Sequence, residues 1–209
     1  MPAASYTTRE LSPQTWPDFE KLFTRKNGWD FCWCMHFQRA RARPGENSQI
    51  RAVRSVVNRR DKKRLVDAGQ AHGILVYAEG EPVGWCQYGL REELPRIDHS
   101  PNYRPHEQRE GKLWRITCFV VDKKFRRQGV GTAALKVALA SIRKKGGGLV
   151  EAFPLVPFDE LRRSELQQRG HASSFGNVST HGTVSMFRKL GFKEVGPYGN
   201  KNVLMRKFV

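Results

Sequence analysis

The stretch DKKFRRQGVGTAAL, residues 122–135, constrains the fold of this 209-residue chain more than any other stretch. It follows LWRITCFVV (113–121), an apolar run typical of a buried strand, and it leads into a helical pattern that ends at three glycines, 146–148. Gly129 and Gly131 leave the backbone N–H groups at the helix start unobstructed, so these groups can converge on phosphate oxygens. A strand, a basic loop and a helix in this order predict an α/β fold with an anion site before the helix.

Two common nucleotide-binding turns match this stretch poorly. Gly129, Gly131 and Ala134 satisfy the spacing G-x-G-x-x-G/A of a dinucleotide-binding turn, and Glu151 supplies an acid further along. In such a turn the strand runs almost directly into the first glycine, whereas seven residues separate Val121 from Gly129. A Walker A loop also fails, because no Gly-Lys-Ser/Thr follows. The sequence therefore favours a phosphate-bearing ligand other than a dinucleotide or a Walker A nucleotide.

Two motifs, in the correct order, resemble those of the GNAT superfamily of N-acetyltransferases. Arg126-x-x-Gly129-x-Gly131 lies between a strand and a helix and resembles the acetyl-CoA signature of that superfamily. Phe187-x-x-Leu-Gly-Phe resembles the end of its last helix. The resemblance covers residues 5–209 and implies acetyl-CoA as the cosubstrate, no metal ion, and direct attack of a primary amine on the thioester.

The resemblance also implies which residues contact the coenzyme. The backbone at the end of the predicted strand would pair with the pantetheine arm, and the basic loop with the first helical turn would surround the diphosphate. The residues implied are Phe119, Val120, Val121, Arg126, Arg127, Gln128, Gly129, Val130, Gly131, Thr132 and Phe187. This is chemically coherent, because pantetheine amides need strand-like partners and a diphosphate needs N–H donors and positive charge.

Acetyl transfer needs a group that removes a proton from the acceptor, since a lysine-type amine has a pKa of about 10.4. Relatives often carry a carboxylate on the fourth strand, but residues 114–118 include no acid. Glu151, on the neighbouring predicted strand, is therefore our first candidate for the general base. Asp98, His99 and His181 are further candidates.

Negative charge that develops during the reaction also needs partners. We expect a backbone N–H near Phe119 to stabilise the oxyanion. Relatives use a tyrosine as general acid where this chain has Phe187, and a phenyl ring cannot donate a proton. Ser185 or Thr183 could instead donate a hydrogen bond to the departing thiolate, or the thiolate could leave unassisted. Thr180 stands where relatives often carry an asparagine, so the sequence does not predict whether this chain makes the contact that the asparagine makes in relatives.

The whole chain reads as one α/β domain, with a mixed, mostly antiparallel sheet of about seven strands flanked by helices. The predicted order of elements is β-α-α-β-β-β-α-β-α-β-β. The parts expected within residues 1–209 are an N-terminal strand with two helices (5–70), a central sheet with the coenzyme motif (74–153), an inserted loop (154–178) and a C-terminal helix with a hairpin (179–209). A second long loop, 91–112, is expected to form a lid or a wall of the site.

Lysine and arginine outnumber aspartate and glutamate by 37 to 20, which gives a net charge of +17 and favours anionic partners. Ten basic residues lie between Arg39 and Arg64, and apolar residues recur at helical spacing over 49–68. This pattern predicts an amphipathic helix with its charges outside, which is either a solvated face or a docking face.

The first partner we expect is a small primary amine. The alternatives are a macromolecular amine, such as charged tRNA or a protein, and non-catalytic binding of nucleic acid. The sequence does not decide between a monomer and a homodimer.

Cys32-x-Cys34-x-His36 lies in the aromatic stretch WDFCWCMHF. Zinc sites favour two to four residues between paired cysteines, so we expect this stretch to form core or to line the acceptor pocket. Four cysteines do not make a disulfide framework, and the chain shows neither a signal-peptide pattern nor an apolar run long enough to cross a membrane. We therefore expect a cytoplasmic enzyme with reduced thiols and no membrane partner.

Overall fold

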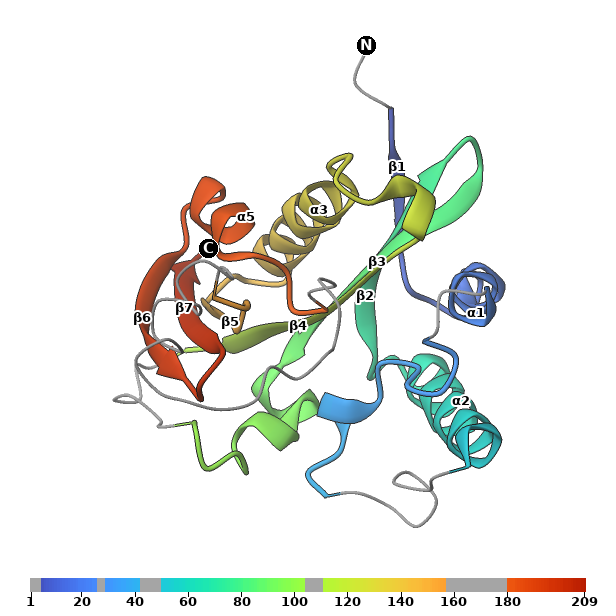
Figure 1. The fold of residues 1–209 in the computed structure, drawn as a ribbon, viewed down its shortest axis with the longest axis horizontal. Helices are drawn as coiled ribbons and strands as arrows, with labels where there is room; N and C mark the ends of the chain where they lie inside the picture. Colours follow the sequence, from blue (N-terminus) through green and yellow to red (C-terminus); the bar gives the residue numbers. More distant parts are fainter. Residues whose placement is uncertain (1–4, 26–28, 42–49, 104–110, 157–179) are drawn as a thin grey trace, which may run out of the picture.

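The computed structural model describes residues 5–25, 29–41, 50–103, 111–156 and 180–209 (Figure 1). Its helices are α1 (Trp16–Thr24), α2 (Arg51–Asp67), α3 (Val130–Lys144) and α5 (Val184–Lys189), with short 3-10 helices η1 (His36–Gln38), η2 (Arg91–Glu93), η3 (Pro95–Ile97) and η4 (Lys123–Phe125). Its strands are β1 (Thr7–Glu10), β2 (His72–Ala78), β3 (Glu81–Leu90), β4 (Leu113–Val121), β5 (Leu149–Ala152), β6 (Lys193–Tyr198) and β7 (Asn202–Phe208). The described elements follow the predicted order. Residues 157–178 of the inserted loop lie outside the described part of the chain.

One seven-stranded sheet has the order β1-β2-β3-β4-β5-β7-β6. All neighbouring strands are antiparallel except β4 and β5. These two are parallel because α3 connects them and returns the chain in the same direction. The prediction of a mixed, mostly antiparallel sheet flanked by helices is confirmed.

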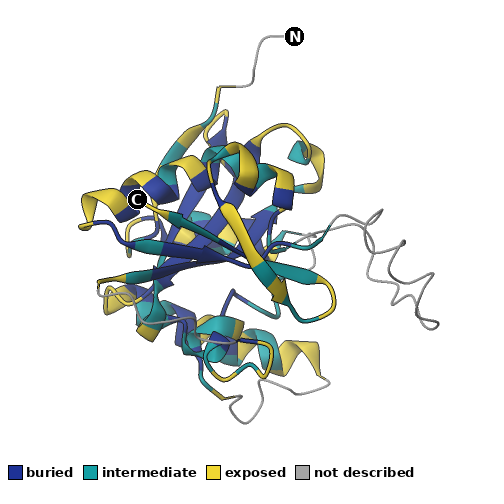
Figure 2. Ribbon diagram, turned by 90° about the vertical axis from the view of Figure 1, so that its left-hand side faces the viewer, coloured by how far each residue is buried: buried dark blue, intermediate teal, exposed yellow. Residues whose placement is uncertain are grey.

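Helices cover both faces of the sheet (Figure 1). On one face α3 and α5 share a core with β4 residues such as Ile116 and Phe119. On the other face α1 and α2 pack on Trp85, Cys118 and Val120. Figure 2 shows buried strands between two helical layers whose outer surfaces are exposed. None of the helices in the described ranges has the length and apolar character to cross a membrane.

A bulge in the pairing of β3 with β4 sets the directions of the side chains in the middle of β4. Cys86 pairs with Phe119 but Tyr88 pairs with Ile116, so β4 carries one additional residue at this point. Ile116 and Phe119 therefore pack on the same face, although residues three apart point to opposite faces of a regular strand. Cys118 faces the opposite layer, with α1 and α2.

The sheet opens beside the second half of β4. Pairing with β5 extends only from Leu113 to Ile116, while β4 continues to Val121. Beyond that point the segment that precedes α5 lies against β4, and the Phe119 N–H donates to the Thr180 carbonyl at 2.6 Å. The end of β4, where the chain turns toward α3, is thus free of a neighbouring strand on this side.

The sequence predicts the wrong buried face for α2. Val56 is 68% exposed, whereas Asn58, Asp61 and Lys62 are buried. The polar residues can be buried because they have partners: Arg39 donates to Asn58 at 2.7 Å and to Asp61 at 2.6 Å. Apolar spacing cannot show this, because the deciding contacts come from a residue outside the helix.

The first part of the predicted loop 91–112 is attached to the sheet by Arg115 of β4. The fully buried Arg115 side chain donates to both carboxylate oxygens of Asp98 at 2.8 Å and to the Leu94 carbonyl at 2.9 Å. The segment also contains η2 and η3, so it is more regular than the sequence predicts. Residues 104–110 lie outside the described part of the chain.

Candidate active site

The first turn of α3 presents backbone N–H groups that have no acceptor within the described ranges. These are the amides of Val130, Gly131 and Thr132. The first bond of the helix runs from the Ala133 N–H to the Gly129 carbonyl, at 2.9 Å. Unbonded N–H groups at a helix start attract anions, and the helix dipole strengthens this attraction.

The backbone before α3 adopts left-handed conformations at Arg127 and Gly129, with φ of +62° and +87°. A Cβ atom added to Gly129 would meet no other atom within 4 Å. The backbone angle, and not crowding, therefore favours glycine here. The Tyr6 hydroxyl donates to the Gln128 carbonyl at 3.1 Å and ties this turn to the start of β1.

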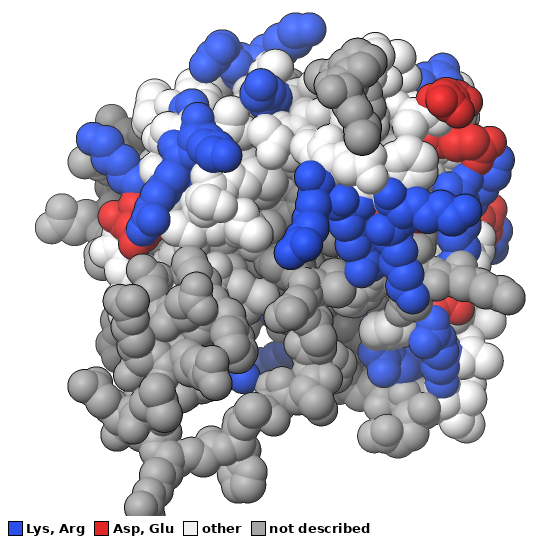
Figure 3. Space-filling view, turned by 45° about the horizontal axis from the view of Figure 1, so that its top comes forward, with Lys and Arg blue, Asp and Glu red and all other residues white. Residues whose placement is uncertain are grey.

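Basic side chains surround the turn. Arg126 Nε donates to the Val121 carbonyl at 3.2 Å, which keeps this side chain beside the end of β4. Lys123, Lys124 and Arg127 are exposed. Figure 3 shows a face of the molecule on which lysine and arginine side chains gather and acidic side chains are few. The surroundings of the turn thus suit a multiply charged anion.

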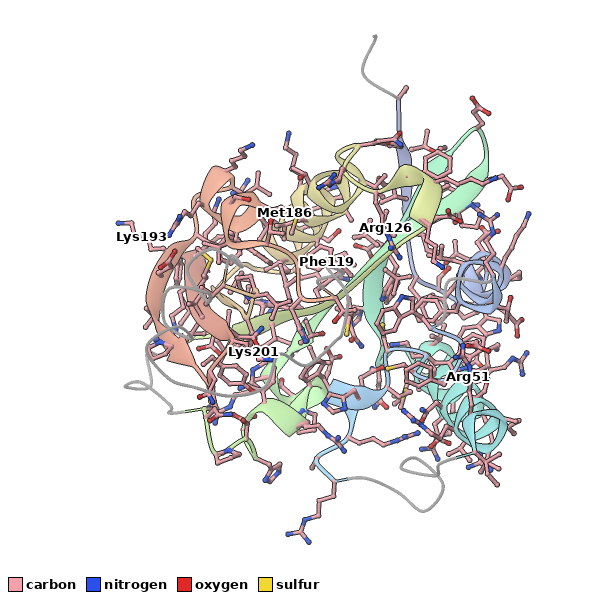
Figure 4. All side chains as sticks on the ribbon, in the orientation of Figure 1. Arg51, Phe119, Arg126, Met186, Lys193 and Lys201 are labelled. Carbon is pink, nitrogen blue, oxygen red and sulfur yellow. The ribbon has the colours of Figure 1, made fainter. Side chains whose placement is uncertain are left out.

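Phe119 connects this turn with α5. A Cβ atom on Gly131 would lie 3.5 Å from the Met186 sulfur and 3.9 Å from the Phe119 ring. Figure 4 labels Phe119 and Met186 together with Arg126 of the basic loop. The fully buried Phe187 ring lies edge-on at 6.1 Å from Phe119 and at 5.0 Å from Phe192. The structure thus places the turn of the first motif beside Met186 of α5 and Phe187 in the core.

Two hydroxyl groups lie at the start of α5. The Thr183 hydroxyl accepts from the Met186 N–H at 3.3 Å and caps the helix. Ser185 is exposed, and its hydroxyl oxygen lies 3.2 Å from that of Thr183. The role of Ser185 toward a leaving thiolate stays a prediction.

A pocket of about 170 Å³, here called the inner pocket, lies between β4 and the WDFCWCMHF stretch. Its lining consists of Phe23, Trp29, Cys32, Cys34, His36, Phe37, Cys118, Phe119, Val120, Thr180 and His181. Most of this lining is apolar and none of it is acidic. The aromatic stretch contributes both to the core, through Trp33, and to this pocket.

A second pocket of about 420 Å³, here called the outer pocket, shares His36 and Phe37 with the inner pocket. Its other lining residues are Ala40, Arg41, Arg96, His99, Ser100 and Tyr198. Two arginines and no acid make the outer pocket positive. His99, a candidate base from the sequence, lies here and does not line the inner pocket.

His181 is the candidate base that the structure places in the inner pocket. Its Nδ1 atom lies 2.8 Å from the Thr117 carbonyl oxygen, and its ring meets Phe37 edge-on at 5.7 Å. A carbonyl only accepts, so Nδ1 carries the proton and Nε2 of the neutral ring is the basic atom. Burial lowers the pKa of His181, and the bond to Thr117 offsets this only in part. The ring is therefore neutral at pH 7 and able to take a proton.

Glu151 lies in a buried ion network and lines neither pocket. Its carboxylate accepts from the Tyr103 hydroxyl at 3.0 Å and from Arg206 at 2.6 Å, and it lies 3.7 Å from Arg115 Nε. These partners give Glu151 a structural role. Its position disfavours the predicted role as the general base.

Asp98 serves the same network. It accepts from Arg91 at 2.9 Å in addition to Arg115. Burial raises the pKa of Asp98, but the hydrogen bonds and charges of Arg115 and Arg91 outweigh burial and lower it. A carboxylate held in this way is a weak base, so Asp98 is also disfavoured as the general base.

Sequence reasoning missed two neighbours of Cys34. Cys118 lies with it in the lining of the inner pocket, and Lys62 is fully buried beside the same thiols. Placing Cys118 requires the bulge in β4, and a lysine in a helix rich in arginine reads as solvent-exposed. Within the described ranges, no three His, Cys, Asp or Glu side chains are grouped so that they could hold a metal ion.

A comparison with known protein families identifies one match. A family model described as Acetyltransferase (GNAT) family matches residues 9–157. The matched span extends from β1 through the turn before α3 to beyond β5. No curated protein matches this sequence.

Solved structures share the fold at low sequence identity. The ribosomal-protein-alanine N-acetyltransferase from Brucella melitensis aligns with a TM-score of 0.53 and 14% identity, over 97% of this chain and 99% of that one. The PaiA N-acetyltransferase from Thermoplasma acidophilum, in complex with coenzyme A, aligns with a TM-score of 0.52 and 14% identity, over 98% and 99% of the two chains. An acetyltransferase from Thermus thermophilus gives 0.51 and 14% over the full length of both. This likeness concerns the fold and says nothing about the acceptor.

Proposed function

Because this chain belongs to the acetyltransferase (GNAT) family, we propose that it transfers the acetyl group of acetyl-CoA to the primary amine of a small acceptor. One observation carries the proposal. The unbonded N–H groups at the start of α3 lie at the end of β4, where Phe119 borders both this turn and the inner pocket. A site for an anionic donor and a pocket for an acceptor thus meet at one residue.

The start of α3 fits the diphosphate of the coenzyme. The N–H groups of Val130, Gly131 and Thr132 would bind its oxygens, and Arg126 and Arg127 would add positive charge. The Thermoplasma acidophilum structure with coenzyme A has the same fold, which supports this assignment. Acetyl-CoA bound here supplies an acetyl group already activated as a thioester.

The Phe119 N–H is our proposed donor to the thioester carbonyl. It now donates to the Thr180 carbonyl at 2.6 Å, so the thioester oxygen must take the place of the Thr180 oxygen. One carbonyl acceptor replaces another, so the N–H never lacks a partner. The bond then strengthens as negative charge develops on the thioester oxygen.

We assign the general base to His181 in place of Glu151. His181 lines the pocket that also contains Phe119, and its Nδ1–H is held by the Thr117 carbonyl, which leaves Nε2 to accept the proton of the amine. A neutral imidazole is able to do so at pH 7 because burial lowers its pKa. For the leaving thiolate we retain Ser185 as hydrogen-bond donor, with unassisted departure as the other route.

The two pockets define the acceptor that we propose. An engineered apolar cavity of about 150 Å³ holds a benzene molecule, so the inner pocket suits an apolar body of that size next to the amine. The outer pocket, with Arg41 and Arg96, suits a carboxylate or phosphate at the far end of the acceptor. A polycationic amine would find no acidic partner in the lining of either pocket.

A macromolecular amine is the second candidate, because the Brucella melitensis structure carries the name of a ribosomal-protein-alanine N-acetyltransferase. The sequence left the basic helix α2 as either a solvated face or a docking face, and several of its cations already have acidic partners. These pairs are Arg51–Asp30, Arg59–Glu20 and Lys63–Asp67. Local pairing lowers the charge that α2 can offer a polyanion, which favours the small acceptor.

Two measurements test the proposed function. Acetyl-CoA at a hundred times its dissociation constant should stabilise the protein by about 2.7 kcal/mol in a thermal-shift titration. Amines are then screened by release of free coenzyme A thiol, in pairs that differ only in a terminal carboxylate and with a polyamine as the contrast. We expect the apolar amine with a carboxylate to react fastest. If acetyl-CoA gives no stabilisation and no amine releases thiol, the transferase proposal is refuted. If the polyamine reacts fastest, the proposed acceptor class is refuted.

A further inference from the structure

The segment between Asp122 and Leu149 carries positive charge that no acid of the segment offsets. Residues 123–148 include eight lysine and arginine residues and no aspartate or glutamate. They form η4, the turn before α3, α3 itself and the residues that end it. Nearly half of the net charge of +17 therefore comes from about one eighth of the chain.

Most of these cations have no acidic partner among the residues that the structure describes. The exception is Lys145, whose ammonium nitrogen lies 3.9 Å from a Glu10 carboxylate oxygen. On α2, by contrast, three ion pairs with carboxylates offset part of the charge. The uncompensated surface charge therefore lies mainly on the α3 side of the sheet.

The cations of α3 lie on one face of the helix, away from the sheet. The opposite face packs in the core through residues such as Leu135 and Ile142. Lys136 and Arg143 are seven residues apart, so two helical turns bring them onto the same side, about 10 Å apart along the axis. Lys144 is adjacent, and all three cations are exposed.

The positive surface continues at the N-terminal end of the helix. The α3 face is defined here by six exposed cations: Lys123, Lys124, Arg127, Lys136, Arg143 and Lys144. Figure 3 brings the upper side of Figure 1, where α3 lies, toward the viewer, and lysine and arginine side chains gather there. The 15 residues of α3 alone extend over about 22 Å, a length that covers several phosphates of a nucleic-acid strand.

The α3 face has no apolar anchor. None of the large apolar side chains that are exposed in the described ranges belongs to η4 or α3; they are Ile50, Val53, Val56, Val195 and Phe208. A protein interface is built around a largely apolar centre, and a membrane-binding helix inserts an apolar face among the lipids. Binding to a nucleic-acid backbone needs only cations that displace counterions from phosphates. The composition of this face therefore fits nucleic acid better than an acidic protein or a membrane.

The same face favours a double helix over a single strand. Proteins that bind single strands stack the unpaired bases on aromatic side chains. Phe125 is the one aromatic residue within 123–148, and it packs against the core. Phosphates are then the groups that the α3 face can contact, and contacts with phosphates do not read base sequence.

We propose that the α3 face binds the phosphate backbone of a nucleic-acid double helix without preference for base sequence. Such binding goes beyond the proposed function, because the duplex is an anchor for the protein and not the acetyl acceptor. α3 packs on one face of the sheet, whereas Phe23 of α1 and the WDFCWCMHF stretch line the inner pocket on the other. A duplex bound along α3 therefore leaves the acceptor pocket open.

The direct test titrates a fluorescently labelled DNA duplex of about 20 base pairs with the full-length protein, without acetyl-CoA. Fluorescence anisotropy is measured at salt concentrations from about 0.05 to 0.2 M. We expect the logarithm of the affinity to fall linearly with the logarithm of the salt concentration, because bound cations release counterions. A duplex of unrelated sequence should bind within about twofold, and the separated strands should bind more weakly.

One variant combines Lys136→Gln, Arg143→Gln and Lys144→Gln. These side chains are exposed and lie outside the turn before α3, so the fold and the thermal shift with acetyl-CoA should be retained. The slope of log affinity against log salt should become smaller by about 3, one for each lost phosphate contact. At about 0.1 M salt the affinity for the duplex should fall by about tenfold or more.

The matched control removes three exposed cations from the other layer: Arg51→Gln, Arg60→Gln and Arg64→Gln. This variant has the same net charge as the first, and its salt slope should change by less than about 1. Equal losses of affinity in the two variants would mean that the duplex responds to net charge alone. That result would refute the α3 face as the docking surface.

Other polyanions decide the class of partner. Polyglutamate and vesicles that contain phosphatidylserine are titrated under the same conditions and should bind more weakly than the duplex. If either binds as tightly as the duplex, the face suits an acidic protein or a membrane, and the nucleic-acid proposal is refuted. Single strands that bind as tightly as the duplex, or no duplex binding at the lowest salt, would refute it as well. The transferase proposal is tested separately, because these titrations use neither acetyl-CoA nor an amine.

Discussion

Burial of His181 disfavours protonation of its ring. The pKa of His181 should therefore set the pH below which kcat/KM declines. The pKa of His181 is lowered from its ordinary value of 6.5, so kcat/KM should hold as pH falls to 6.5 and decline only below it. His181→Gln should lose about 100-fold of kcat/KM and this acid limb together. His99→Gln, in the outer pocket, is the control and should keep the limb. If His181→Gln keeps the decline of kcat/KM at low pH, a group other than His181 is the general base.

Asp98 and Arg115 should make the fold sensitive to acid. The pKa of Asp98 is lowered in the folded protein, so its contribution to stability is present above the unfolded pKa of about 3.9 and is lost as pH falls through the folded value. Asp98→Asn leaves buried Arg115 without this charge and should cost about 3 kcal/mol near pH 7. The difference from wild type should shrink below pH 4 in urea unfolding.

The control for this prediction is Asp67→Asn, which removes the exposed pair between Asp67 and Lys63 on α2. An exposed pair four residues apart in a helix contributes about 0.5 kcal/mol or less. Equal losses in the two variants at pH 7 would show that the buried network does not hold the 91–103 segment to the sheet.

Among the elements, the start of α3 offers a matched pair of glycines. Gly129 and Gly80 both have positive φ, +87° and +78°, and an added Cβ at either would meet nothing within 4 Å. Alanine at either position should therefore cost a similar 1–2 kcal/mol, roughly, of backbone strain. Only Gly129→Ala should also weaken acetyl-CoA binding, by about tenfold in calorimetry, because it shifts the N–H groups of the turn. Equal affinities in the two variants would remove this turn from the coenzyme site.

The helices and strands also show which features of the fold can be predicted from the sequence and which cannot. The turn before α3 could be predicted, because it lies in a short motif whose residues are close in sequence. The buried face of α2 could not, because Arg39 decides it from outside the helix. Glu151 was an attractive base on its strand, yet Tyr103 and Arg206, distant in sequence, enclose its carboxylate. Long-range polar contacts are the part that periodicity and motifs do not report.

For the molecule as a whole, the sheet separates two functions that meet at β4. The α3 and α5 layer would bind the coenzyme. On the α1 side of the sheet, Phe23 of α1 and the WDFCWCMHF stretch line the inner pocket. The bulge in β4 lets Phe119 face the first layer while Cys118, its neighbour, faces the second. Neighbouring residues of one strand thus connect the donor side with the acceptor side.

This division predicts where the net charge of +17 acts on the coenzyme. Lys123→Gln with Lys124→Gln, beside the α3 turn, should weaken acetyl-CoA binding by about threefold at low salt, a modest effect because exposed charges interact weakly. Arg60→Gln with Arg64→Gln, on α2, removes the same charge from the other layer and should leave the affinity unchanged. In Figure 4, Arg51 of α2 lies far from Arg126 beside that turn.

Salt distinguishes a local contact from the field of the whole molecule. The gap between wild type and the Lys123 and Lys124 variant should narrow at 0.3 M salt, because screening shortens the reach of exposed charges to less than about 8 Å. If the α2 variant weakens binding equally at low salt, the coenzyme responds to net charge alone. The basic loop would then lose its assigned part in holding the diphosphate, and the backbone N–H groups of α3 would be left as its ligands.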